Sequence, residues 1–137
     1  MGYSSSTYGD ICALICKMLT IVDTNISSEG KNLFERKMAS KLKLTKEKLL
    51  VSFFSIDFMM LFAGADYHRL PPQAKTVAQI NLYSGVFAKL SDNEQKELIR
   101  LVKEVCSECN LDDAISESLQ KWLLFIYQSN SINDNDS

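Results

Sequence analysis

Apolar residues recur every three or four positions along most of the chain, which is the spacing of one face of an α-helix. This spacing predicts six helices. In chain order, their apolar positions are Ile11, Ile15, Met18 and Val22; Leu33, Phe34, Met38 and Leu42; Leu49, Phe53, Phe54, Phe58 and Phe62; Val77, Ile80, Leu82 and Val86; Leu98, Val102, Val105 and Cys109; and Leu119, Trp122, Leu123 and Ile126. The third segment is rich enough in Phe and Val to suit a strand, but its length favours a helix. The predicted class is all-α.

Polar residues stand where these helices should begin. A break at residues 25–27 offers a cap for the second helix, and Thr45 can cap the third. Pro72 fits the first turn of the fourth helix, where a missing N–H costs nothing. Residues 91–94 read Ser-Asp-Asn-Glu, a capping box that starts the fifth helix, and Asp112 is placed to cap the sixth. The segment 64–70 is the one substantial loop that we expect.

The six helices divide into two sets of three with similar connections. The first break of each set is offset by 64 residues, at Ser27 and Ser91, and the second by 67, at Leu44 and Leu111. We therefore expect one domain over residues 1–128, a compact bundle of six to seven helices that could derive from two related halves. Chance similarity between capped amphipathic helices remains an alternative. Residues 129–137 are polar and are expected to form a disordered tail.

Residues 22–29, after the first helix, resemble the signature of TerB-like domains. These form the all-α fold of the tellurite-resistance TerB proteins and of the N-terminal part of DjlA-type co-chaperones. Asp23, Ile26 and Glu29 match the family pattern in type and spacing, and residues 42–45 resemble the end of its second helix. The resemblance implies a TerB-like bundle in a bacterial cytosolic protein linked to stress or envelope complexes.

In the family, the acidic residues of this turn have been connected with divalent-metal binding. Asp23, Asn25 and Glu29 are the corresponding candidates here, but they supply at most three side chains, whereas a hard cation prefers six or more oxygen ligands. Thr24 replaces the family glycine, and Phe87 stands where the second half would need an acidic residue. The alternative is that Asp23 caps a turn and that Glu29 complements a helix N-terminus.

The composition is that of a globular protein. Of 137 residues, 46% are hydrophobic and 23% charged, and 15 basic against 17 acidic residues give a net charge of −2. This balance argues against nucleic-acid binding as the main function, because a basic footprint is missing. The longest apolar stretch, residues 49–63, is shorter than a bilayer span and is interrupted by Ser52, Ser55 and Asp57, so it predicts a core helix. The start of the chain lacks a signal sequence, which predicts a cytoplasmic protein.

Charge is distributed unevenly along the chain. Residues 31–48 hold seven basic and two acidic side chains, a net of +5, whereas residues 91–137 hold four basic and ten acidic ones, a net of −6. Lys37, Lys41 and Lys48 recur at helical spacings and are candidates for binding anionic lipid, nucleic acid or an acidic partner. The alternative is that this run is a solvated helix face that pairs with the acidic half.

The four cysteines form two close pairs, Cys12 with Cys16 and Cys106 with Cys109. Two such pairs are the minimum for a tetrahedral zinc site. Both pairs fall inside predicted helices and continue their apolar faces, so core packing is the favoured interpretation, with metal binding and redox chemistry as alternatives.

The single histidine, His68, lies in the predicted loop beside Asp66, Tyr67 and Arg69. General acid–base catalysis would need a positioned partner there. The sequence contains no Gly-rich phosphate loop, serine nucleophile elbow or HExxH motif. We therefore expect a non-enzymatic accessory or protein-interaction domain that needs no cofactor and binds a protein partner. A small acidic chaperone or adaptor for a secreted protein, and a divalent-metal-binding domain, remain alternatives.

Overall fold

The computed structural model describes the backbone of residues 5–135 and the side chains of residues 7–130. This part of the chain is mostly helical and contains no strand, which confirms the all-α prediction. The elements are α1 (Ser5–Val22), α2 (Ser28–Lys41), α3 (Lys46–Met59), the 3₁₀ helix η1 (Met60–Phe62), α4 (Ala65–His68), α5 (Pro72–Tyr83), the 3₁₀ helix η2 (Ser84–Lys89), α6 (Asp92–Glu108) and α7 (Asp113–Asn135).

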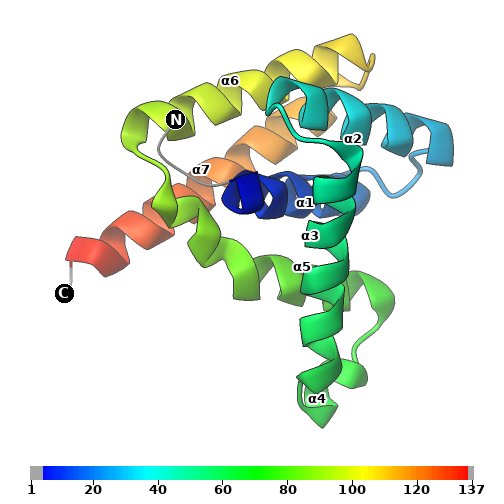
Figure 1. Ribbon diagram of the computed structural model, residues 1–137, viewed down its shortest axis with the longest axis vertical. Helices are drawn as coiled ribbons and strands as arrows, with labels where there is room; N and C mark the ends of the chain where they lie inside the picture. Colours follow the sequence, from blue (N-terminus) through cyan, green and yellow to red (C-terminus); the bar gives the residue numbers. More distant parts are fainter. Residues whose placement is uncertain (1–4, 136–137) are drawn as a thin grey trace.

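Helix α1 is the centre of the bundle (Figure 1). It packs against α2, α3, α5 and α7, while α6 packs against α2 and α7. Between Ile11 and Leu19, every α1 residue except Lys17 is buried. A helix that is apolar around most of its circumference needs neighbours on all sides. The other helices supply these neighbours, with buried Phe34, Phe87 and Leu123 among the largest core side chains.

The caps predicted before α2, α3 and α6 are present. The Ser27 hydroxyl accepts a hydrogen bond from the Gly30 N–H at 3.0 Å, and the Thr45 hydroxyl accepts one from the Lys48 N–H at 3.2 Å. At the start of α6, Ser91 and Glu94 form a complete capping box. Each cap satisfies a backbone N–H that the first turn leaves unpaired.

Helices α2 and α6 also end in the same way. Each is followed by a residue in the left-handed region, Lys43 with φ of 58° and Asn110 with φ of 56°. The next residue is a leucine whose N–H closes the turn, Leu44 onto the Ala39 carbonyl at 2.8 Å and Leu111 onto the Cys106 carbonyl at 3.0 Å. This is the hydrogen-bond pattern of a Schellman motif. The local structure therefore repeats where the sequence suggests two related halves.

Three segments differ from the sequence-based expectations. The loop 64–70 contains the short helix α4. The core helix expected over residues 49–63 becomes 3₁₀ after Met59, and one of its faces is exposed. The tail expected from residue 129 is instead the end of α7, which continues to Asn135 because no Gly or Pro stops it. The Asn130 side chain also donates to the Ser84 carbonyl at 3.4 Å.

Candidate functional site

The outward side of α3 and η1 is apolar and exposed. Seven large side chains form this surface, which we call the α3 face: Leu50, Val51, Phe54, Phe58, Met59, Leu61 and Phe62. Their exposed fractions lie between 45% and 73%. In Figure 1 the C-terminal half of α3 extends beyond the group formed by α1, α2, α6 and α7.

Aromatic rings run along the α3 face in steps of one helical turn. The rings of Phe54 and Phe58 stack with centroids 5.8 Å apart, and those of Phe58 and Phe62 meet edge to face at 5.6 Å. The opposite side of the helix holds Leu49, Ser52 and Ile56 in the core. Helix α3 is therefore apolar on both sides, but the fold buries only one of them.

A polar cleft of about 350 Å³ adjoins the α3 face. It lies between α1, α2, α3 and α5, and Leu50 belongs to both surfaces. Lys17 crosses it, with its ammonium 2.9 Å from an Asp57 carboxylate oxygen and 5.8 Å from the centre of the Phe53 ring. The Gln79 side-chain amide donates to the same carboxylate oxygen at 3.3 Å. The two charges in the middle of the cleft therefore neutralise each other.

Three further titratable groups line this cleft: Glu35, Lys31 and Cys16. Glu35 is half-buried, and burial raises the pKa of its carboxyl, an effect that nearby Lys31 opposes. Cys16 is buried against Cys12, and the hydrogen bond between the two thiols, together with burial, raises the pKa of Cys16 well above its ordinary value. A thiol with a raised pKa is protonated at neutral pH and is a poor nucleophile or metal ligand.

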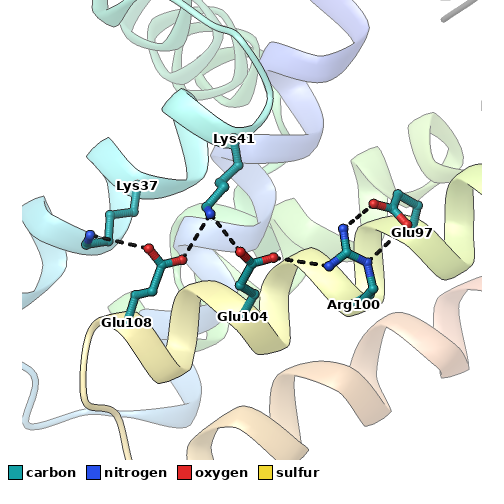
Figure 2. A network of polar contacts seen from close by, with 6 residues as sticks. All are labelled: Lys37, Lys41, Glu97, Arg100, Glu104 and Glu108. Atoms are coloured by element: carbon teal, nitrogen blue, oxygen red, sulfur yellow. Dashed lines mark hydrogen bonds and ion pairs between the residues drawn. The ribbon is translucent and has the colours of Figure 1, made fainter.

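The three lysines proposed as partner-binding residues do not form one free basic stripe. Figure 2 shows Lys37 and Lys41 reaching from α2 to α6. The Lys37 ammonium lies 3.6 Å from Glu108, and that of Lys41 lies 2.8 Å from Glu104 and 3.2 Å from Glu108. The basic and acidic segments of the sequence thus meet at the α2–α6 contact, as the alternative interpretation expected. Lys48, the third candidate, lies in the first turn of α3.

The same network extends along α6. Arg100 pairs with Glu97 on one side, and its other guanidinium nitrogen lies 3.2 Å from Glu104 (Figure 2). Hydrogen bonds from Lys41 lower the pKa of Glu104, and the hydrogen bond to Glu104 raises that of Lys41. All these side chains are partly exposed, so the network orients α2 against α6 more than it stabilises the fold.

The candidate metal ligands are spread along a turn. Asp23 follows α1 and is half-buried, Asn25 is exposed, and Glu29 lies exposed in the first turn of α2. The cap of α2 is Ser27 rather than an acidic residue. Among the described residues, no group of three or more His, Cys, Asp or Glu side chains is placed to hold a metal ion.

The positions of the cysteines agree with the interpretation that they pack in the core. Cys12, Cys16 and Cys106 are buried in the helix packing, Cys109 is partly buried, and all four are free thiols. Burial raises the pKa of Cys106 to about 11, although a hydrogen bond with Ser116 opposes the shift.

His68 ends the short helix α4 and is exposed. Its ring meets that of Tyr67 edge to face, with centroids 5.3 Å apart. Asp66 and Arg69 are exposed as well, and the structure surrounds these residues with solvent rather than with a cleft.

Comparison of the chain with protein-family models, with curated proteins and with solved structures finds no match. Within residues 5–135, no helix has both the length and the apolar character needed to cross a bilayer. The chain therefore belongs to the class of all-α bundles, and its surface is the main indication of what it does.

The α3 face was not predicted from the sequence, in which Phe54, Phe58 and Phe62 were assigned to a core helix. The available signal was that residues 49–62 contain one charged side chain and have apolar residues on every side of the helix. A helix of this kind needs neighbours on all sides, as α1 has, but the bundle supplies them on only one side of α3.

Proposed function

We propose that this chain is a non-enzymatic protein-interaction domain whose α3 face binds a protein partner. The observation that carries this proposal is the size of the face. An aromatic side chain has about 150–250 Å² of surface, and at the lower end of that range, which suits Leu, Val and Met, the exposed fractions leave roughly 700 Å² uncovered. The largest apolar patch on a typical monomer is about 300–600 Å². A patch above that range marks a binding surface or an aggregation liability.

The way in which the face is built supports binding. Phe54 and Phe58 lie on α3 and Phe62 on the 3₁₀ helix η1 that follows it directly. The other side of α3 is anchored in the core by Leu49 and Ile56. A rigid aromatic surface loses little conformational entropy when a partner covers it. Aromatic residues are also the side chains that most often dominate binding energy at interfaces.

Other observations agree with an accessory role rather than catalysis. In the polar cleft, Lys17 and Asp57 are paired with each other, and the hydrogen bond with Cys12, together with burial, raises the pKa of Cys16 and keeps its thiol protonated. His68, the one histidine, stands on the surface beside Tyr67. The resemblance of residues 22–29 to TerB-like domains adds the proposed setting, a bacterial cytosolic protein that takes part in stress or envelope complexes.

The test is affinity capture from the native cell with three forms of the full chain. The first is the natural sequence, and the second carries Phe54→Glu and Phe62→Glu, which place two charges on the α3 face. The third carries Phe125→Glu, a matched control on α7 where the natural side chain is 67% exposed. We expect the natural chain and the control to retain the same protein and the α3 variant to lose it. Retention of every partner by the α3 variant would contradict the proposal.

An apolar face of this kind also suits a small acidic chaperone or adaptor for a secreted protein. Such a protein would hold an unfolded apolar segment of one client on the face, instead of a folded surface. The two functions differ in the captured protein: a client would bind while unfolded and be released when folded, whereas a folded partner would bind in its native state.

A further inference from the structure

The α3 face has the dimensions and the composition of one half of a symmetric interface. Two faces of roughly 700 Å² each bury at most about 1,400 Å² in total when fully paired. Specific protein interfaces bury about 1,200–2,000 Å², or about 800 Å² per partner. The upper limit for one pair of α3 faces therefore lies within the range of a specific dimer.

The face carries little charge. Between positions 49 and 62 the only charged residue is Asp57, whose side chain is 58% exposed. Its carboxylate accepts hydrogen bonds from Lys17 of α1 and Gln79 of α5, so this charge is already paired within the chain. Interfaces between identical chains are more apolar than those between different proteins, and their centres are depleted of charged residues. The face therefore offers little to a partner selected by charge, whereas a second copy brings an apolar surface of the same size.

The order of the rings suits a two-fold axis. Phe54, Phe58 and Phe62 follow one another at intervals of four residues. If two α3 helices pack antiparallel with the axis near Phe58, then Phe54 of each copy lies beside Phe62 of the other and the two Phe58 rings meet. The same patch serves both chains, which is what a closed two-fold dimer requires. The extension of α3 beyond the bundle in Figure 1 lets two such helices approach while the bundles stay apart.

We propose that the occupant of the α3 face is a second copy of this chain, bound through antiparallel α3 helices. This inference rests on the proposed function, because it names the partner of the same face. The interface centre consists of the aromatic rings, with Leu50 and Leu61 near its two ends. The ion pairs of α2 and α6 lie outside it and play no part in the contact.

Sedimentation equilibrium and light scattering on the full chain test the dimer. The chain has a mass of 15.5 kDa, so the natural protein and Phe125→Glu should both give about 31 kDa, twice that value. The double variant Phe54→Glu, Phe62→Glu should give the monomer mass, because carboxylates buried in an apolar interface weaken association by about 100-fold or more. A natural chain that stays monomeric at about 100 μM overturns the inference, as does a double variant that still dimerises.

Hydrogen exchange of the natural chain makes the test independent of the variants. With rising protein concentration, amides between residues 50 and 62 should gain protection, while those around Phe125 should not change. Protection that maps to α7 instead would overturn the inference. If the natural chain is a monomer but still captures another protein through the α3 face, the homodimer is wrong and the proposed function stands. If neither dimer formation nor the capture of another protein depends on the α3 face, both proposals are wrong.

Discussion

Two buried tyrosines offer a pair of identical substitutions with opposite expected signs. Tyr127 is 5% exposed, and its ring meets that of Phe87 edge to face at 6.0 Å. Its hydroxyl oxygen is buried and has no hydrogen-bond partner within the described part of the chain. Burial, with a smaller contribution from Tyr8, raises the pKa of Tyr127. Tyr8 is 6% exposed, but its hydroxyl donates to a Glu94 carboxylate oxygen at 2.8 Å.

The substitution Tyr127→Phe removes an unpaired polar atom and keeps the ring in contact with Phe87. A buried hydroxyl without a partner costs about 1–3 kcal/mol of desolvation. At the low end of that range, we expect the free energy of unfolding to rise by about 1 kcal/mol. For a domain of this size the gain corresponds to a Tm about 3–4 °C higher. The matched change Tyr8→Phe removes a hydroxyl that is bonded to a carboxylate, so it should lower the Tm.

Urea unfolding followed by circular dichroism measures both variants under the same conditions. The free energy of unfolding falls linearly with urea concentration. If the slope is equal for all forms of the chain, the two changes act on stability and not on the compactness of the unfolded chain. A lower midpoint for Tyr127→Phe would refute the reasoning, because it would mean that the hydroxyl contributes a favourable bond. A Tyr8→Phe variant as stable as the natural chain would show that the bond to Glu94 contributes nothing.

Three further changes test other parts of the structure in thermal melts. Ser91→Ala removes the capping box of α6 and should cost about 1 kcal/mol, and an unchanged Tm would contradict the role of the cap. Because the folded pKa of Glu35 is raised by burial, its charged form opposes folding above the unfolded pKa of about 4.3. Glu35→Gln should therefore raise the Tm at pH 7 and lose that advantage below about pH 4, unlike the exposed control Glu117→Gln. Calcium, magnesium, manganese and zinc should leave the Tm unchanged, whereas a rise at saturating metal would point to a site at the turn of Asp23, Asn25 and Glu29.

Helix boundaries were the part of the fold most accessible from the sequence. Ser27, Thr45 and Ser91 each cap the helix that follows them, as their residue types and positions predict. Capping depends on a side chain and a backbone N–H two or three residues away, so no distant contact is needed to specify it. The end of α7 was less accessible, because a polar composition weakens a helix without stopping it.

The ion pairs could be predicted only in part from the sequence. The sequence shows a basic segment and an acidic one, but it leaves open whether Lys37 and Lys41 face a partner or their own chain. The packing of α2 against α6 decides this by bringing Glu104 and Glu108 within reach. Lys48, at the same kind of spacing, lies on α3 and takes no part in that network.

By itself, the sequence determines the all-α class, the starts of the helices and the central place of α1, because these follow from local caps and from apolar periodicity. Only the tertiary structure decides which apolar residues are buried. Phe34 and Phe54 are the same residue type on neighbouring helices, yet one is fully buried and the other is 70% exposed. The reason is geometric: α3 packs one side against the bundle and its C-terminal half extends past the neighbouring helices, so its second apolar side is left uncovered.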